Sequence, residues 1–327
     1  MKFRSFKGTE VAEVGLGTWQ LGGTEWGNVS EEESMRIIQA YVDNGGNFID
    51  TADIYGGGRS EKLIGKFLKS CDKDIHVATK LGRREDDGNG WPQNFTYDAI
   101  KKHIEDSLER LGIQQVFLDQ FHCIPPEQMA SGAVFEHIEK VREQGLIKHW
   151  GASVETIGEA LTCLKYDGLA SLQVIFNIFR QHTADKLFKK AKEKDVAIIV
   201  RVPLASGLLT GKFSRETEFS AKDHRNFNAD GEAFNVGETF SGLPFKTGIQ
   251  LADKVKELLP KVPMPQAALR WILDYPEVTT VIPGASKVSQ IESNVQASEL
   301  KPLSDDVHKR LRTLYDKEIR SMVRGEI

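Results

Sequence analysis

Four side chains capable of acid–base chemistry stand in the first 122 residues, each at or just after the end of a short apolar run. They are Asp50, Tyr55, Lys80 and His122. An apolar core would not accept a carboxylate, an ammonium or a phenol without partners, so the change from apolar to polar residues indicates a site. We expect each of the four to lie at or near the end of a buried strand.

Together the four groups could deliver a proton to an oxygen atom. A buried ammonium requires a carboxylate, which Asp50 can offer to Lys80. An ammonium beside a phenol favours the phenolate, so we expect Lys80 to lower the pKa of Tyr55 from its reference value of about 10. Tyr55 would then protonate a developing alkoxide, while a neutral His122 orients the carbonyl oxygen. Each residue alone also has a structural interpretation, and only their convergence at one place favours catalysis.

The elements that carry these residues must end at one face of the molecule. The pattern predicts a β-hairpin at 3–17 and eight buried strands at 14–18, 46–56, 75–79, 116–122, 149–152, 172–176, 196–200 and 279–282, with helical patterns between them. Eight βα repeats without a linker favour an α/β fold, a (β/α)8 TIM barrel forming one domain over residues 1–327. The alternative is a doubly wound sheet, which would need a third glycine after Gly15-Leu16-Gly17.

One connection departs from the repeat, the long loop after the seventh strand at 213–247. Loops of this length are usually functional or disordered. Its phenylalanines argue against disorder, and we interpret the segment as a lid over the site; they are Phe213, Phe219, Phe227, Phe234, Phe240 and Phe245. The alternative is an insertion that packs these rings on the flank of the barrel.

The composition excludes several other classes of function. With 43 basic and 47 acidic residues and a net charge of -4, we expect no nucleic-acid or membrane partner, and a monomer. Three widely spaced cysteines predict neither a disulfide framework nor a zinc site, and no other metal is expected. The N-terminus has no apolar signal segment, so we expect a cytoplasmic protein.

The stretch from Gly46 to Gly56 resembles the G-x-x-F-x-D-T-A-x-x-Y-G signature of the aldo-keto reductases. The resemblance runs from residues 15–19 to about residue 297. It implies a catalytic tetrad of Asp50, Tyr55, Lys80 and His122, with Tyr55 as the general acid. It also implies an extended nicotinamide cofactor that lies across the barrel mouth.

The resemblance assigns cofactor contacts at five places along the chain. The expected contacts are Thr18, Trp19, Ser153, Gln173, Arg201, Pro203, Leu204, Ser206, Gly207, Leu208, Lys212, Gly284, Ser286, Lys287, Gln290 and Asn294. Ser286 and Lys287 at a helix start favour NADPH over NADH, although the position that is often arginine is Gln290. Arg201 stands where many members have an aromatic ring, and we hypothesise that its charge favours the reduced cofactor over the oxidised one.

The substrate is expected to be a small carbonyl compound with an apolar body. Trp19, Trp26 and Trp91 would line its pocket together with Tyr55 and His122. The function predicted is therefore NADPH-dependent reduction of an aldehyde or ketone to an alcohol. Two alternatives stay open: a non-catalytic subunit that senses nicotinamide nucleotides, and a lyase or aldolase that uses Lys80 as a Schiff-base amine.

Overall fold

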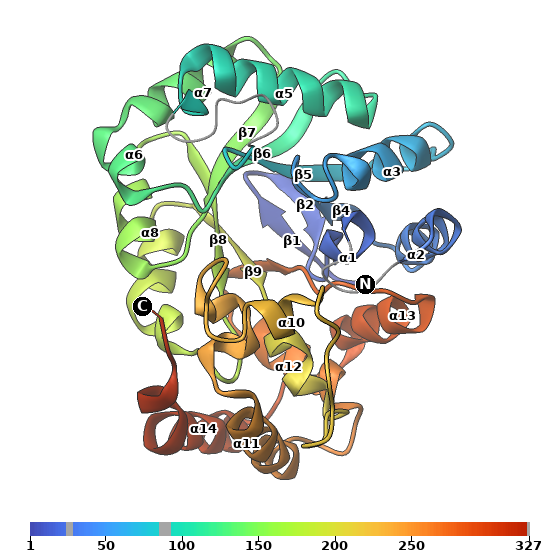
Figure 1. The fold of residues 1–327 in the computed structure, drawn as a ribbon, viewed down its shortest axis with the longest axis vertical. Coiled ribbons are helices and arrows are strands. Elements are labelled where there is room, and N and C mark those ends of the chain that lie inside the picture. Colours follow the sequence, from blue (N-terminus) through green and yellow to red (C-terminus); the bar gives the residue numbers. More distant parts are fainter. Residues whose placement is uncertain (24–28, 85–92, 326–327) are drawn as a thin grey trace.

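Eight parallel strands form the centre of the computed structural model, which describes residues 1–23, 29–84 and 93–325. They are β3 (Leu16–Gly17), β4 (Phe48–Asp50), β5 (His76–Leu81), β6 (Val116–His122), β7 (Ile147–Ser153), β8 (Leu169–Ile175), β9 (Ala197–Arg201) and β10 (Val278–Val281). Each pairs with the next along the chain. Isolated parallel bridges from Val14 to Val281 and from Gly17 to Gly284 join the two ends of the sheet. The predicted (β/α)8 barrel is confirmed, and helices surround its strands (Figure 1).

The helices follow the strands in the expected alternation. The α-helices are α1 (Trp19–Gly22), α2 (Glu31–Asp43), α3 (Arg59–Leu68), α5 (Tyr97–Leu111), α6 (Pro126–Ser131), α7 (Ala133–Glu143), α8 (Ile157–Cys163), α9 (Lys189–Glu193), α10 (His224–Phe227), α11 (Phe245–Leu258), α12 (Met264–Leu273), α13 (Val288–Gln296) and α14 (Asp305–Leu314). Short 3-10 helices are η2 (Ala205–Thr210), η3 (Val236–Glu238), η4 (Phe240–Gly242), η5 (Ala297–Glu299) and η7 (Arg320–Met322), and π-helical turns are η1 (Ala184–Phe188) and η6 (Tyr315–Ile319).

Local sequence signals explain where two of these helices begin and end. The Ser30 hydroxyl accepts the backbone N–H of Glu33 at 3.1 Å and so caps α2. Gly112 ends α5 in the left-handed region, with a φ of 67° that a side chain would strain. Both ends therefore follow from local sequence.

The N-terminal hairpin closes the end of the barrel at which the strands begin. It pairs β1 (Phe3–Phe6) with β2 (Thr9–Ala12) around the predicted turn. Phe6 and Val11 are fully buried and belong to a small apolar cluster with Phe48 and Phe117, near the starts of β4 and β6. These side chains fill the interior of the barrel at the end where the strands begin.

The segment 213–247 carries its own short helices and splits its aromatic side chains into two groups. Phe213, Phe219, Phe240 and Phe245 pack against one another, with ring centroids 4.9 to 5.8 Å apart. The other two rings, Phe227 at the end of α10 and Phe234 just before η3, lie 6.1 Å apart between centroids and line the cavity described below. The first group packs on the hydrophobic core and so anchors the segment to the barrel.

Among the described residues, no helix has the length and apolar character needed to cross a membrane.

Candidate active site

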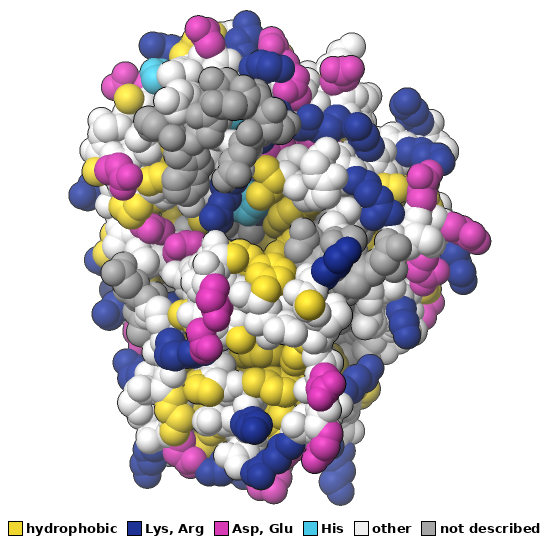
Figure 2. Space-filling view, in the orientation of Figure 1, with side chains coloured by type: hydrophobic (Ala, Val, Ile, Leu, Met, Phe, Trp, Pro, Cys, Tyr) yellow, Lys and Arg dark blue, Asp and Glu magenta, His cyan; other side chains and the backbone are white. Residues whose placement is uncertain are grey.

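A cavity of about 720 Å³ opens where the strands end. Its lining comes from β4, β6, β7, β8 and β9, from α1 and from segments that follow β9 and β10. Figure 2 shows a hollow on the viewed face, bordered by hydrophobic, basic and histidine side chains. Asp50, Tyr55 and His122 all line this cavity, and Lys80 lies just behind them, only 1% exposed. The structure therefore brings together the four residues that the sequence singles out.

The Lys80 ammonium contacts three oxygen atoms of residues at the end of β4 and just after it. It donates to Asp50 Oδ1 at 2.5 Å, to the Thr51 carbonyl at 2.7 Å and to the Tyr55 hydroxyl at 3.5 Å. Burial opposes the charge, but Asp50 and Tyr55 outweigh it and raise the pKa of Lys80. Lys80 is thus a protonated amine beside a phenol, and an amine in that state cannot attack a carbonyl.

The second oxygen of Asp50 accepts two side-chain amides. Gln173 Nε2 donates to Asp50 Oδ2 at 2.8 Å, and Gln120 Nε2 donates at 3.3 Å. The Gln173 amide nitrogen, expected to face the cofactor, thus serves the carboxylate in this structure. Gln120 was not predicted, although it stands two residues before His122 on a buried strand and so shares its side of the sheet.

Tyr55 is positioned by close packing as well as by Lys80. A side chain on Gly22 would place its Cβ 2.7 Å from the Cβ of Tyr55, so only glycine lets α1 approach this closely. The Trp19 ring stacks on the Tyr55 ring with centroids 6.0 Å apart. Burial raises the pKa of Tyr55, and the lowering effect of Lys80 is smaller. The expectation of a lowered pKa is wrong, because the loss of water around the half-buried phenol outweighs the charge of Lys80.

His122 stays neutral near pH 7. Burial lowers its pKa well below the usual value, and the charges of Lys80, Arg83 and Arg201 act in the same direction. Its ring meets the Tyr55 ring edge-on with centroids 5.8 Å apart. Its Nδ1 is buried without a hydrogen-bond partner among the described residues. A neutral imidazole at this place can donate one hydrogen bond to a carbonyl oxygen.

Most of the expected cofactor contacts line the same cavity. Those that do are Thr18, Trp19, Ser153, Gln173, Arg201, Pro203, Leu204, Ser206, Gly207, Lys212, Gly284, Ser286, Gln290 and Asn294. Two do not, because Leu208 packs into the core at 2% exposure and Lys287 is exposed outside the lining. His122 pairs with Ser153 on the next strand, and Ser153 pairs with Gln173 on the strand after that. The ends of β6, β7 and β8 therefore place these three side chains next to one another in the cavity wall.

The amide of Gln290 fills the start of α13. Its Oε1 accepts the Ser286 backbone N–H at 2.7 Å, the Ser286 hydroxyl at 3.1 Å and the Lys287 backbone N–H at 3.2 Å. These are the donors that a phosphate at this helix start would use. Asn294 donates weakly to the Gly284 carbonyl at 3.5 Å.

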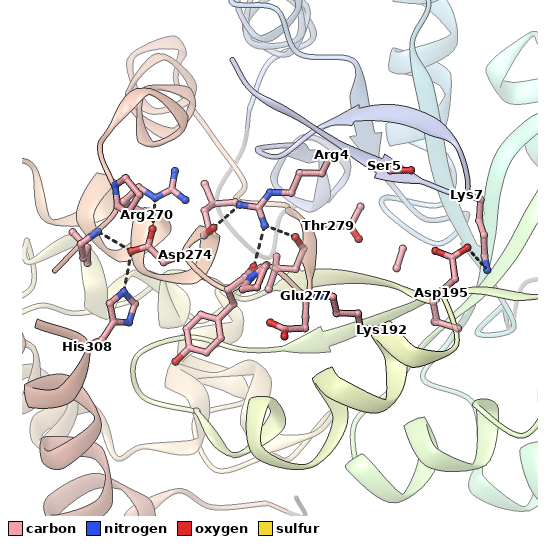
Figure 3. Close-up of a pocket in the computed structure, with 18 of the residues that line it drawn as sticks. Arg4, Ser5, Lys7, Lys192, Asp195, Arg270, Asp274, Glu277, Thr279 and His308 are labelled. Atoms are coloured by element: carbon pink, nitrogen blue, oxygen red, sulfur yellow. Dashed lines mark hydrogen bonds and ion pairs between the residues drawn. The ribbon is translucent and has the colours of Figure 1, made fainter. Parts of the chain in front are cut away.

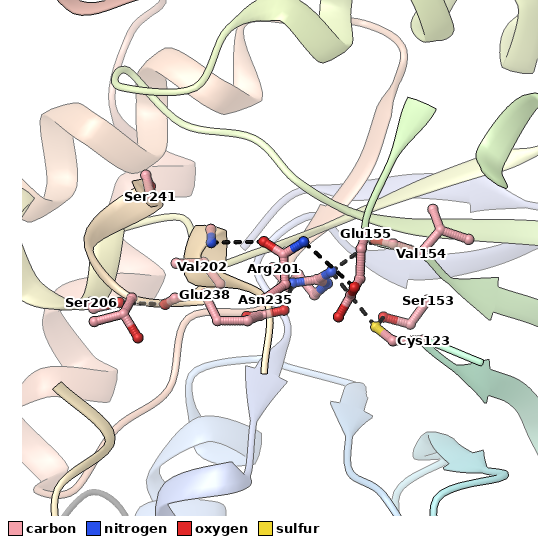
Figure 4. A network of polar contacts seen from close by, with 12 residues as sticks. Cys123, Ser153, Val154, Glu155, Arg201, Val202, Ser206, Asn235, Glu238 and Ser241 are labelled. Atoms are coloured by element: carbon pink, nitrogen blue, oxygen red, sulfur yellow. Dashed lines mark hydrogen bonds and ion pairs between the residues drawn. The ribbon is translucent and has the colours of Figure 1, made fainter. Parts of the chain in front are cut away.

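Arg201 forms a network between the barrel and the segment 213–247 (Figure 4). Its guanidinium pairs with Glu238 and donates to the Val154 carbonyl at 2.7 Å. Ser206 in turn donates to the Glu238 carbonyl at 2.7 Å. Glu238 was not predicted, and its carboxylate offsets the charge that Arg201 would bring to a nicotinamide ring.

Within the described residues, the aromatic wall of the cavity comes from Trp19 and from segment 213–247. Trp19 contacts His224 at 5.1 Å and Phe234 at 5.9 Å between centroids, and Phe227 also lines the cavity. Trp26 and Trp91, the other two predicted substrate contacts, lie outside the described residues. Segment 213–247 therefore supplies part of the wall.

A second hollow, of about 900 Å³, lies at the other end of the barrel, beside the first residues of β9 and β10 (Figure 3). Its charged groups bind one another: Asp274 accepts Arg270 Nε and pairs with His308 Nε2, both at 2.9 Å, and Arg4 donates to the Val278 carbonyl at 2.5 Å. These bonds tie the hairpin and α14 to the barrel, which is a structural role.

The family model described as "Aldo/keto reductase family" matches residues 13–316. The chain belongs to the aldo-keto reductase family. This aldo-keto reductase is an oxidoreductase, and its family generally reduces carbonyl groups with a nicotinamide cofactor.

Relatives and solved structures agree with this assignment. The aldo-keto reductase YhdN of Bacillus subtilis is 30% identical over 297 residues, covering 88% of this chain and 85% of the relative. The probable voltage-gated potassium channel subunit beta of Arabidopsis thaliana is 27% identical over 318 residues, covering 90% of each. The glycerol dehydrogenase AKR11B4 of Gluconobacter oxydans superposes with a TM-score of 0.80 at 28% identity, covering 99% of this chain and 97% of that one. The holo form of the aldo-keto reductase AKR11C1 of Bacillus halodurans gives 0.79 at 28% identity, covering 96% of both chains.

Proposed function

We propose that this aldo-keto reductase reduces a small aldehyde or ketone to an alcohol with NADPH, and that Tyr55 supplies the proton. The observation that carries the proposal is the contact of a buried, protonated Lys80 with both the Asp50 carboxylate and the Tyr55 hydroxyl. A lyase mechanism through a Lys80 imine is disfavoured, because that mechanism needs a neutral amine.

The side chains of the site have different roles in the proposed reaction. Because its pKa is raised, Tyr55 holds its proton until the carbonyl oxygen gains negative charge. Lys80 then stabilises the phenolate that forms, and Asp50 balances the ammonium. His122, being neutral, donates a hydrogen bond to the same oxygen and sets its direction. The bound nicotinamide supplies the hydride that the carbonyl carbon takes up.

The cavity has the chemistry to hold a dinucleotide. Backbone around η2 includes Gly207 at a φ of 100°, and Lys212 lines the cavity nearby, so N–H groups and a cation are available for a pyrophosphate. Beyond it the start of α13 offers Ser286, next to Lys287, to the 2'-phosphate that distinguishes NADPH from NADH. The TM-score of 0.79 to the holo form of the Bacillus halodurans enzyme, against 0.70 to its apo form, is consistent with a formed groove.

The test compares wild type with Tyr55→Phe. We expect Tyr55→Phe to lower the kcat for aldehyde reduction by at least a hundredfold, because the proton donor is lost. The Kd for NADPH, measured by quenching of tryptophan fluorescence, should change less than threefold. Turnover by Tyr55→Phe close to wild type would refute the assignment of the acid. Tight NADPH binding by wild type with no turnover on any aldehyde would instead favour the nucleotide-sensing alternative, which the channel-subunit relative brings into view.

A further inference from the structure

A second ion pair lies behind the tetrad, between Asp53 and Arg84. Asp53 comes two residues before Tyr55, and Arg84 comes four residues after Lys80. Arg84 Nε donates to Asp53 Oδ2 at 2.7 Å, and the two side chains are 7% and 0% exposed. Neither residue is part of the cavity lining. Burying such a pair costs free energy unless its geometry is good and further hydrogen bonds satisfy its remaining polar atoms.

Arg84 acts as a junction of three segments. Besides Asp53, it donates from Nη1 to Asp106 Oδ2 at 2.6 Å and from Nη2 to the His103 carbonyl at 3.3 Å, both on α5. Its own carbonyl accepts the side-chain amide of Asn94 at 2.7 Å. The guanidinium thus fixes the chain after β5 to the chain after β4 and to a long helix outside the barrel.

Asp53 is connected to the β5 side twice. Its side chain binds Arg84, and its backbone N–H donates to the Lys80 carbonyl at 3.1 Å. The short chain between Asp50 and Tyr55 is therefore fixed to the strand that carries Lys80 at a point two residues from the phenol. Any shift of Asp53 would move the Tyr55 hydroxyl relative to the Lys80 ammonium, which it contacts at the long distance of 3.5 Å.

The surroundings of Asp53 show that the carboxylate depends on this partner. Glu61 and Asp119 face it from α3 and β6, and Arg84 and Arg110 face it from the chain after β5 and from α5. Arg110 Nε binds Glu61 at 2.6 Å, which leaves Arg84 as the cation bound directly to Asp53. Burial raises the pKa of Asp53 to about 7, with Arg84 as the main opposing influence.

We propose that the Asp53–Arg84 pair is a positioning device that sets the Tyr55 hydroxyl against Lys80 for proton transfer. The inference rests on the proposed function, because it assigns Asp53 and Arg84 to the step in which Tyr55 gives up its proton. Neither residue lines the cavity that would hold the substrate and the cofactor. Their effect is confined to the chemical step and leaves binding unchanged.

The experiment uses Asp53→Asn, Arg84→Lys and the matched control Asp106→Asn. Asp106 binds the same guanidinium but is 28% exposed and also pairs with Lys102, and within the described part of the chain its side chain makes no direct hydrogen bond to residues 50–55. Each variant is assayed for kcat and KM with one aldehyde, for the NADPH Kd by fluorescence, and for Tm. We expect Asp53→Asn and Arg84→Lys to lower kcat at least tenfold while KM and the NADPH Kd stay within twofold. Asp106→Asn should keep kcat within twofold.

The outcomes separate this inference from the proposed function. The positioning role is overturned if the kcat of Asp53→Asn stays within twofold of wild type, or if kcat falls equally in Asp106→Asn. The proposed function still holds in either case if Tyr55→Phe is inactive. Parallel losses of kcat, cofactor affinity and Tm would also overturn it, because they indicate general unfolding of the site. If Asp53→Asn does not fold, the same criteria are applied to Arg84→Lys. That variant keeps the positive charge and loses the planar guanidinium. If Tyr55→Phe is active, Tyr55 is not the acid and the proposed function fails, whatever the results with the other variants.

Discussion

The amide of Gln290 competes with any phosphate for the start of α13, and this competition can be measured. Its oxygen accepts three hydrogen bonds from Ser286 and Lys287 at 2.7 to 3.2 Å. A 2'-phosphate needs the same donors, so it must first displace the amide oxygen. Gln290→Ala removes the competitor, and we expect it to strengthen NADPH binding.

The magnitude follows from the three bonds. A net hydrogen bond contributes about 0.5 to 1.5 kcal/mol, and these bonds lie at an exposed helix start, so the low end applies. Three bonds at about 0.5 kcal/mol give about 1.5 kcal/mol, which corresponds to about a tenfold lower Kd for NADPH. NADH has no 2'-phosphate, and its Kd should stay within about twofold.

The assay is a fluorescence titration of each variant with NADPH and with NADH. Gln290→Glu serves as the matched control, because a carboxylate at the same place keeps the bonds and repels a phosphate, and it should weaken NADPH binding alone. The reasoning is refuted if Gln290→Ala shifts both cofactors equally. It is also refuted if Gln290→Ala weakens NADPH, because Gln290 would then be a ligand of the cofactor.

Two further predictions concern stability. Tyr41→Phe should lower the free energy of unfolding by about 1 to 3 kcal/mol. The buried Tyr41 hydroxyl accepts the Phe48 N–H at 3.1 Å and donates to the Phe48 carbonyl at 2.9 Å or to the Val14 carbonyl at 3.1 Å, and phenylalanine would leave these groups without a partner. Urea unfolding measures the change in stability, and an unchanged midpoint would contradict the prediction. His182 has its pKa lowered to about 3, mainly by burial and then by Arg180, whereas the unfolded value is about 6.5. Between these values the unfolded chain binds the extra proton, so stability falls as pH drops, by up to about 1.4 kcal/mol per pH unit from this residue. Urea unfolding at several pH values should show a shallower loss in His182→Gln, and equal slopes would contradict the reasoning.

Strand ends and the tetrad are predictable from sequence because both depend on local pattern. A polar residue after a buried run is costly unless it is used, and parallel strands bring such residues to one face, which is why Asp50, Lys80 and His122 meet. The proton affinity of Tyr55 is not predictable in this way. It depends on burial by α1 and on rings from distant segments, which outweigh the charge of Lys80.

Contacts through irregular segments are the ones that the sequence does not reveal. Glu238 reaches Arg201 from 37 residues away, across a segment with no regular period. Gln290 contacts Ser286 only four residues away, and a glutamine at the third position of a helix is a recognisable cap. That contact was open to prediction from spacing, whereas the Glu238 contact was not.

The way the barrel is closed has a consequence for how the chain must be made. Its first strand is bridged to its last, and Arg4 bonds to Tyr275 over 271 positions of the chain. During synthesis, therefore, the growing N-terminal strands emerge with one edge unpaired until nearly the whole polypeptide has left the ribosome. Such an exposed edge invites pairing with other nascent chains. Truncation before residue 278 should leave a product that aggregates, even though every tetrad residue is present in it.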